Sequence, residues 1–171
     1  VPFGSAGSGT TSHLTMELFT QMSGISLSHV PYKGSSTSMI DVMAGRVPLM
    51  FDSLPGVLTN VKSGSLRAIA VASAQRDPLL PNVPTVAESG VPGFATSGWI
   101  GLLAPARTPP QIVDQLHTAV AKALKSEAVK KRMSELAFTP IGNLPETGFL
   151  REYTNEALGL IKRNISRRWP E

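Results

Sequence analysis

The chain has 171 residues, 42% of them hydrophobic, and a formal net charge of +4. This length and apolar content are typical of one globular domain or two small ones, and they exclude a disordered tail. Cysteine is absent, which excludes disulfides, zinc fingers and cysteine nucleophiles, and no apolar run approaches the ~20 residues that span a bilayer. The chain begins at Val1 without a charged segment, an apolar stretch and a cleavage site, so we expect no signal peptide in it.

Basic residues are in excess in the second part of the chain, where two clusters stand out: Lys130, Lys131 and Arg132, and Arg163, Arg167 and Arg168. A nucleic-acid site of the stacking kind needs basic residues next to aromatic ones. Aromatic residues make up 6% of the chain and do not interleave with the basic residues of either cluster. We therefore interpret the clusters as solvent-exposed helix faces and expect no nucleic-acid partner.

Hydrophobic periodicity and turn residues predict alternating strands and helices in the first 72 residues. The predicted elements are a strand over 2–6, a helix from residues 10–12 to Gly24, a strand over 25–30, a helix over 35–44 capped by Ser35 or Ser36, a strand over 47–51, a helix over 54–62 and a strand over 66–72. The last two strands are almost wholly apolar, which is typical of buried parallel strands.

The segment 75–97 is rich in proline and glycine, which predicts a long irregular connector of a functional or interdomain kind. Beyond it we predict a buried strand over 97–105, a helix that begins after Thr108 as its N-cap and turns an apolar stripe toward a core, a helix over 127–136 capped by Ser126, a short strand over 138–140 and a helix over 145–165. The alternation of strands and helices predicts an α/β fold with a mostly parallel sheet.

Three turns follow predicted strands, at residues 7–13, 31–36 and 52–55, and together they are rich in glycine and small hydroxyl residues. In open α/β sheets, ligands bind beyond the carboxyl ends of the strands. We therefore expect the three turns to form one rim that holds the functional site.

The first turn, GSAGSGTT over 4–11, is close to a phosphate-binding P-loop, but Thr10 stands where that motif requires lysine. It also fails the dinucleotide motif G-x-G-x-x-G, because Ser12 replaces the third glycine, and the nucleophile motif G-x-S-x-G. What remains is a glycine turn before a helix N-terminus, where unpaired amides, the helix dipole and hydroxyl groups favour an anion. Such a cradle suits a carboxylate; the alternative is that these hydroxyls only cap the helix.

The histidines near these turns admit a catalytic and a structural interpretation. His13 and His29 lack the further ligands that a zinc site needs, so we expect neither a metal nor a cofactor. Ser8, His13 and Asp52 could form a hydrolase triad, but no motif orients them. We therefore favour structural roles, with His13 packed in a first helical turn and His29 hydrogen-bonded on a strand.

The second and third turns also leave alternatives open. Lys33 could pair with an anionic ligand or point to water, and Tyr32 could line a site or a core. Asp52 could accept a hydrogen bond from a ligand or cap the helix over 54–62.

The segments GSAGSGTTSHLTMELF (4–19), HVPYKGSSTSMIDVMAGRVPLMFDSLP (29–55) and SGWIGLLAPARTP (97–109) resemble the receptors of tripartite tricarboxylate transporters, the Bug-type extracytoplasmic solute-binding proteins. The resemblance implies a type-II periplasmic-binding-protein fold, in which two α/β domains close on a small carboxylate, amino acid or aromatic acid. It also implies a periplasmic receptor without enzymatic activity that presents its ligand to membrane transporter subunits.

The resemblance further implies which residues contact the ligand. In that family, backbone amides, hydroxyl groups and waters hold the carboxylates of the ligand. The corresponding residues of this chain are Ser8, Gly9, Thr10, Thr11, Ser12, His13, Tyr32, Lys33, Gly34 and Asp52.

Family members are considerably longer, so the resemblance implies that this chain is truncated at its N-terminus. Residues 1–95 then form the second, ligand-binding domain, and residues 96–171 are the returning part of the first domain. A strand over 97–104 would lack partners, and unpaired apolar strands tend to pair with other chains, so we expect a homodimer or a strand-swapped oligomer. Two other functions stay open: a serine hydrolase that uses Ser8, His13 and Asp52, and an interaction module whose contact surface is the basic C-terminal helix.

Overall fold

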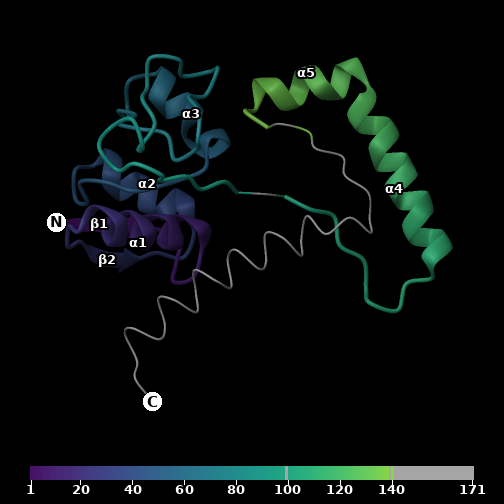
Figure 1. The fold of residues 1–171 in the computed structure, drawn as a ribbon, viewed down its shortest axis with the longest axis horizontal. Coiled ribbons are helices and arrows are strands. Elements are labelled where there is room, and N and C mark those ends of the chain that lie inside the picture. Colours follow the sequence, from purple (N-terminus) through teal and green to yellow (C-terminus); the bar gives the residue numbers. More distant parts are fainter. Residues whose placement is uncertain (99, 139, 141–171) are drawn as a thin grey trace. The chain divides into compact units, whose positions relative to one another are not determined.

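The computed structural model describes residues 1–98, 100–138 and 140, and the chain divides into two compact units, Val1–Gly101 and Leu102–Glu171 (Figure 1). The first unit holds β1, β2, α1, α2 and α3, and the described part of the second holds α4 and α5. The predicted domain boundary at residues 95–96 lies close to this division. The assignment of the two parts to a second and a first domain stays a prediction.

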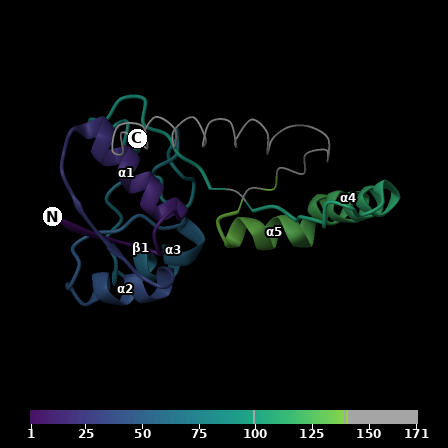
Figure 2. The ribbon, with the colours of Figure 1, turned by 90° about the horizontal axis from the view of Figure 1, so that it is seen from below.

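A small parallel sheet organises the first unit. β1 (Pro2–Ser5) pairs in parallel with β2 (Ser28–Pro31), and Gly4 of β1 forms a further parallel bridge with Met50. β1 therefore lies in the middle, with β2 on one side of it and the segment at Met50 on the other. Right-handed crossovers in opposite directions place their helices on opposite faces, and Figure 2 shows α1 and α2 on opposite sides of β1.

The three helices of this unit confirm the predicted ones to within a residue or two. α1 spans Thr11–Ser23, α2 spans Ser35–Met43 and α3 spans Leu54–Lys62. As predicted, Gly24 ends α1: its φ of 73° is the left-handed conformation that glycine adopts at helix ends.

The start of α2 differs from the prediction, because its N-cap is Gly34 and not Ser35 or Ser36. Gly34 has a φ of 117°, which only glycine adopts without strain, and this sharp turn lets the helix begin at once. The Ser35 hydroxyl is then free to bond elsewhere, and it donates to Asp52.

The connector contributes to the core of the first unit. The buried apolar side chains come from β1, α1, the segment before α3, α3 itself and the connector: Phe3, Met16, Val47, Leu58, Val86 and Phe94. The ring of Phe94, in the connector, lies edge-on to Phe19 of α1, with centroids 6.1 Å apart, and stacks on Phe51 at 6.3 Å. The proline-rich connector is therefore packed against the sheet unit rather than loose.

Two predicted strands of this unit are present only as single bridges. The segment 47–51 pairs at Met50, and the segment 66–72 pairs at Val71, which bridges Thr85 in parallel. The predicted burial of 66–72 is wrong in part, since Ile69 is 72% exposed. An apolar run becomes a strand only where a neighbouring strand takes up its backbone hydrogen bonds.

The predicted strand over 97–105 is wrong for the residues that the structure describes there. They belong to no strand, and Ile100, Leu102 and Leu103 are largely exposed. Phe138 and Pro140 likewise lie outside any strand, whereas the predicted helix over 145–165 and the basic residues 163, 167 and 168 lie outside the described residues. The pairing of residues 97–104 with a second copy stays a prediction.

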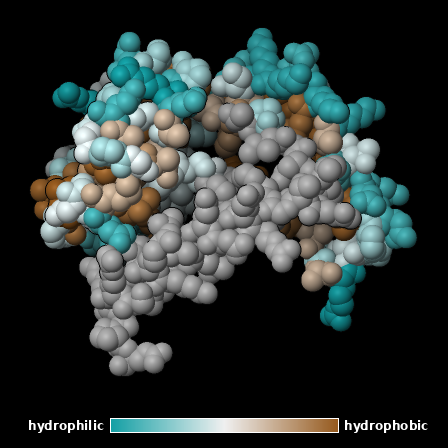
Figure 3. Space-filling view, in the orientation of Figure 1, coloured by the Kyte–Doolittle hydropathy of each residue, from teal (hydrophilic) through white to brown (hydrophobic). Residues whose placement is uncertain are grey.

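In the second unit, α4 (Pro110–Lys125) and α5 (Glu127–Glu135) confirm two predicted helices. Pro109, not Thr108, is the N-cap of α4, and its apolar stripe, predicted to face a core, is 39–44% exposed at Ile112, Leu116 and Val120. Figure 3 shows a hydrophilic edge along these helices, with hydrophobic side chains on the other side. In the described part of the chain, no helix is both long and apolar enough to cross a membrane.

Candidate functional site

Three loops meet at one edge of the sheet, as the sequence predicts. We call them loop A (residues 6–10), loop B (residues 32–34) and loop C (residues 51–53). Each follows a strand or bridge of the same parallel set and leads into α1, α2 or α3. Because the strands run in parallel, their carboxyl ends lie at one edge, where ligands of open α/β sheets bind.

Direct hydrogen bonds hold the loops together. The amide of Gly34 in loop B donates to the carbonyl of Ala6 in loop A at 3.0 Å, and the amide of Tyr32 donates to the carbonyl of Ser5 at 3.2 Å. From the first turn of α2, the Ser35 hydroxyl donates to the Asp52 carboxylate in loop C. The three turns therefore form one contiguous rim.

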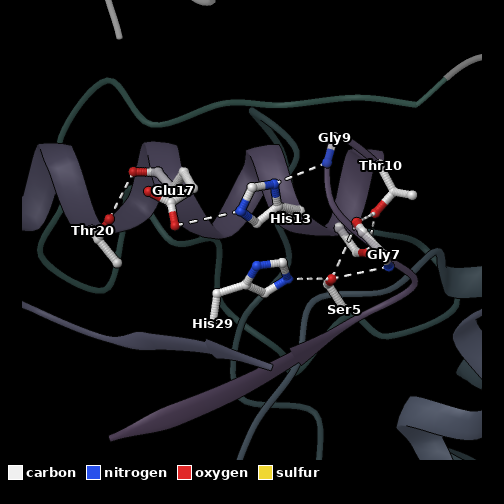
Figure 4. Close-up of polar contacts among 9 residues, drawn as sticks. Ser5, Gly7, Gly9, Thr10, His13, Glu17, Thr20 and His29 are labelled. Atoms are coloured by element: carbon white, nitrogen blue, oxygen red, sulfur yellow. Dashed lines mark hydrogen bonds and ion pairs between the residues drawn. The ribbon is translucent and has the colours of Figure 1, made fainter. Parts of the chain in front are cut away.

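Hydroxyl groups within loop A and immediately beside it hold the loop in shape (Figure 4). The amide of Gly7 donates to Ser5 Oγ at 3.1 Å, the amide of Ala6 donates to Ser12 Oγ at 3.0 Å, and Thr10 Oγ1 donates to the carbonyl of Gly7 at 2.6 Å. Thr10 is the N-cap of α1 but makes no side-chain cap bond. For Thr10 and Ser12, the alternative that the hydroxyls only cap the helix is wrong, because these two hydroxyls bond within the loop instead.

The amides at the start of α1 remain available to a ligand. Among the described residues, the amides of Ser8, Thr11, Ser12 and His13 have no hydrogen-bond acceptor. Ser8 and Thr11 are exposed, so water or a ligand can reach them. Unpaired amides at a helix N-terminus, with the partial positive charge of the helix dipole, stabilise an anion.

A cluster of four side chains lies between α1 and the sheet, beneath loop A (Figure 4). The rings of His13 and His29 stack with centroids 3.9 Å apart. His29 Nε2 lies 2.6 Å from Ser5 Oγ, and His13 Nε2 lies 3.6 Å from Glu17 Oε1. His29 is a hydrogen-bonded strand histidine, as predicted.

The sequence reasoning missed Ser5 and Glu17, although two signals point to them. Glu17 follows His13 by one helical turn, and residues at i and i+4 face each other on a helix. Ser5 ends β1 beside β2, which carries His29.

The predicted alternative of a Ser8–His13–Asp52 triad is wrong. Both ring nitrogens of His13 are engaged, Nδ1 by the amide of Gly9 at 3.1 Å and Nε2 by Glu17. Asp52 accepts bonds from Ser35 and from the amide of Ser53 at 2.7 Å. Among the described residues, Ser5 and His29 form a serine–histidine contact, but Ser5 is fully buried and cannot reach a substrate.

In loop B, Tyr32 and Lys33 differ in how much of the side chain is free. The Tyr32 hydroxyl donates to Asp41 Oδ2 at 2.7 Å, which leaves its ring as the part that can line a site. Arg46, and after it Tyr32, lowers the pKa of Asp41, because both hydrogen-bond to its charged form. Lys33 is exposed, and its amine has no partner among the described residues.

In loop C, Asp52 does not cap α3, whose N-cap is Ser53, so the capping alternative for Asp52 is wrong. Its carboxylate instead ties loop C to the first turn of α2 through Ser35. Within the described ranges, no group of three or more histidine, aspartate or glutamate side chains is placed to hold a metal ion.

The half-buried His29 predicts a pH dependence of stability. Burial, and next the neighbouring His13, lower the pKa of His29, while Glu17 opposes the shift. The folded state then prefers neutral His29, whereas the unfolded state takes up a proton near the ordinary value of about 6.5. The stabilisation is complete above about pH 6.5 and is lost as the pH falls through the lower pKa of the folded state.

We expect the melting temperature of the chain to be lower at about pH 5.5 than at about pH 7.5. The variant His29→Gln keeps a polar atom near the position of Nε2 but does not titrate. Its melting temperature should therefore decrease less over this pH interval. His117→Asn, in the second unit, is the matched control and should behave as the parent. Equal losses for the parent and His29→Gln, measured by circular dichroism, would contradict this explanation.

A parallel α/β sheet whose strand ends carry a rim of helix-start loops with unpaired amides is the architecture of a ligand-binding protein. Comparison with known proteins agrees. The family model described as "Tripartite tricarboxylate transporter family receptor" matches residues 1–162. The chain belongs to this family of solute-binding receptors, whose fold is that of the periplasmic binding proteins.

Two curated relatives illustrate the match. The "UPF0065 protein in clcB-clcD intergenic region" of Pseudomonas knackmussii is 38% identical, over 96% of this chain and 92% of the relative. Protein BugT of Bordetella pertussis is 34% identical, over 95% of this chain but 50% of the relative.

Solved structures agree in fold. R. palustris Rpa4515 with adipate is 36% identical with a TM-score of 0.84, and the match covers 98% of this chain and 55% of that one. The periplasmic binding protein BugD is 30% identical with a TM-score of 0.85, over 98% and 56%. MatC from Rhodopseudomonas palustris with bound malate is 29% identical with a TM-score of 0.76, over 95% and 55%. The chain thus spans about half the length of these structures.

Proposed function

We propose that the chain forms one side of the binding site for a small organic acid in a solute receptor. The observation that carries the proposal is the set of unpaired amides in loop A and the first turn of α1, from Ser8, Thr11 and Ser12, at the rim where the three loops meet. Directed neutral donors bind a carboxylate without the large positive charge that a phosphate site uses. The neighbours with adipate and malate support this chemistry, since both ligands are dicarboxylates.

The other two loops supply the rest of this side of the site. Lys33, exposed and without a partner in the described chain, can attract the anion or pair with its second carboxylate. Asp52 and Ser35 fix loop C against α2, so that both helix starts keep their positions. The proposed contact residues are those that the family resemblance implies, with the Tyr32 ring rather than its hydroxyl as the contacting part.

The family also suggests the partners and the location. We propose that the longer receptor closes on its ligand and delivers it to the membrane subunits of a tripartite tricarboxylate-type transporter. The periplasmic binding proteins among the neighbours support an extracytoplasmic location. Since the chain spans about half of those structures, residues 1–95 are proposed to form the second domain of the longer receptor, and residues 96–171 the returning part of its first domain.

Calorimetric titration of the chain with adipate, malate and citrate tests the proposal, with butylammonium as a cationic control. We expect heat with at least one acid and none with the cation. The amide NMR signals of Ser8, Thr11 and Ser12 should shift on addition of the acid that binds. A chain that gives neither heat nor amide shifts with any of the three acids would contradict a role in carboxylate binding.

A further inference from the structure

Two histidine rings connect loop A to the body of the first unit. His13 Nδ1 accepts the amide of Gly9 at 3.1 Å (Figure 4). His29 Nε2 meets Ser5 Oγ at 2.6 Å, and Ser5 Oγ in turn accepts the amide of Gly7 at 3.1 Å. Each ring is therefore linked to a residue that shapes the loop, and the two rings are stacked 3.9 Å apart.

The two links respond differently to a proton. A backbone amide can only donate, so the bond from Gly9 needs a lone pair on His13 Nδ1, and a proton on that atom breaks the bond. The Ser5 hydroxyl both donates and accepts. If His29 Nε2 becomes a donor, the Ser5 hydroxyl can turn to the carbonyl of Gly7, 3.3 Å away. The link between Gly9 and His13 is therefore the proton-sensitive one.

The charges around the pair show which ring has a counter-ion beside it. In the described part of the chain, the charged group that faces the rings is Glu17 of α1, whereas β1 contributes Phe3 and Ser5, which carry no charge. A charge on His13 has Glu17 as its counter-ion, whereas burial and the adjacent ring lower the pKa of His29. Because Glu17 compensates the charge of protonated His13, that charge attracts an anionic ligand only weakly. The main effect of the proton is then the loss of the bond that holds loop A.

We propose that His13 is a positioning residue that makes ligand binding at the start of α1 sensitive to pH. Neutral His13 holds Gly9 and keeps loop A in its binding geometry, and a proton on His13 Nδ1 breaks this bond and releases the loop. This inference rests on the proposed function, because it concerns the affinity of the same cradle for a carboxylate.

The first test measures adipate affinity by calorimetry at about pH 7.5 and pH 5.5. The loss of one hydrogen bond in the loop predicts about a fivefold weaker affinity at the lower pH for the parent and for the control His117→Asn. His13→Asn keeps an acceptor near the position of Nδ1 but takes up no proton, so its loss should stay below about twofold. Adipate itself also takes up protons at the lower pH, but this effect is the same for every variant and cancels when their affinities are compared. Equal losses in the parent and His13→Asn would overturn the proposal.

The second test needs no ligand. The ¹⁵N signal of His13 Nδ1 and the amide signal of Gly9 should move with one midpoint as the pH falls, and the Gly9 signal should stay still in His13→Asn. A Gly9 amide that does not follow the titration of His13 would overturn the proposal, whatever adipate does. Coupled titration without adipate binding at either pH would instead support the loop switch and count against the proposed function alone.

Discussion

Thr11→Asp should abolish or severely weaken the binding of dicarboxylates without harming the fold. Thr11 is the first residue of α1 and is exposed, and its amide has no acceptor among the described residues. A negative charge in the first turn of a helix stabilises the helix by about 0.3–1 kcal/mol. The same charge faces the incoming carboxylate, and such like-charge contacts cost several kcal/mol, so we expect an affinity loss of about 100-fold or more.

Two controls separate charge from shape in this experiment. Thr11→Asn has nearly the shape of Thr11→Asp without its charge, and it should keep the affinity within about threefold. Gln111→Glu adds one negative charge to the first turn of α4 in the second unit, and it should leave binding unchanged. Affinity is measured by calorimetry and stability by urea unfolding. If Thr11→Asp bound adipate as well as Thr11→Asn, the anion would not lie at the start of α1.

Phe94→Ala should cause the largest loss of stability. Phe94 is 1% exposed and contacts Phe19 of α1 and Phe51, which directly precedes Asp52 of loop C. Truncation of a buried phenylalanine to alanine removes apolar contacts and leaves a cavity, at a cost of about 3–5 kcal/mol. Because whole domains are stable by only about 5–15 kcal/mol, a large part of the unit should unfold at room temperature or in little urea.

Ile69→Ala is the matched control for this prediction, since Ile69 is also apolar and lies in the same unit but is 72% exposed. Its effect should stay within about 0.5 kcal/mol. Urea unfolding followed by circular dichroism measures both variants. A loss below about 1 kcal/mol for Phe94→Ala would show that the connector is not part of the core.

The local order of the first unit could be predicted from the sequence, because the signals are local. Glycine at position 24 and the apolar periodicity before it are sufficient to place the end of α1. The motif around Gly7 and Gly9 predicts a loop with accessible amides, since the missing lysine excludes a phosphate cradle and leaves an anion site of low charge. Parallel strands then bring the three loops to one edge without further information.

The strands were harder to predict than the helices. A helix makes its hydrogen bonds within its own segment, whereas a strand needs a partner that is distant in the sequence. The segments 66–72 and 97–105 have the composition of strands but find at most a single bridge among the described residues. The apolar stripe of α4 is a similar case. Its spacing predicted a buried face, but a helix face is buried only if another element packs against it, and the stripe is partly exposed.

By itself, the sequence determined the alternation of strands and helices and the glycine-rich start of α1, and it predicts a carboxylate rather than a phosphate as the ligand there. Only the tertiary structure decided that His13 and His29 stack, that Ser5 and Glu17 complete their cluster, and that Asp52 bonds Ser35 rather than capping α3. The physical reason is the separation in sequence between the residues that interact. Backbone conformation and helix ends depend on neighbours within a few residues, whereas the partner of a polar side chain is chosen by the register of strands that pair across the sheet.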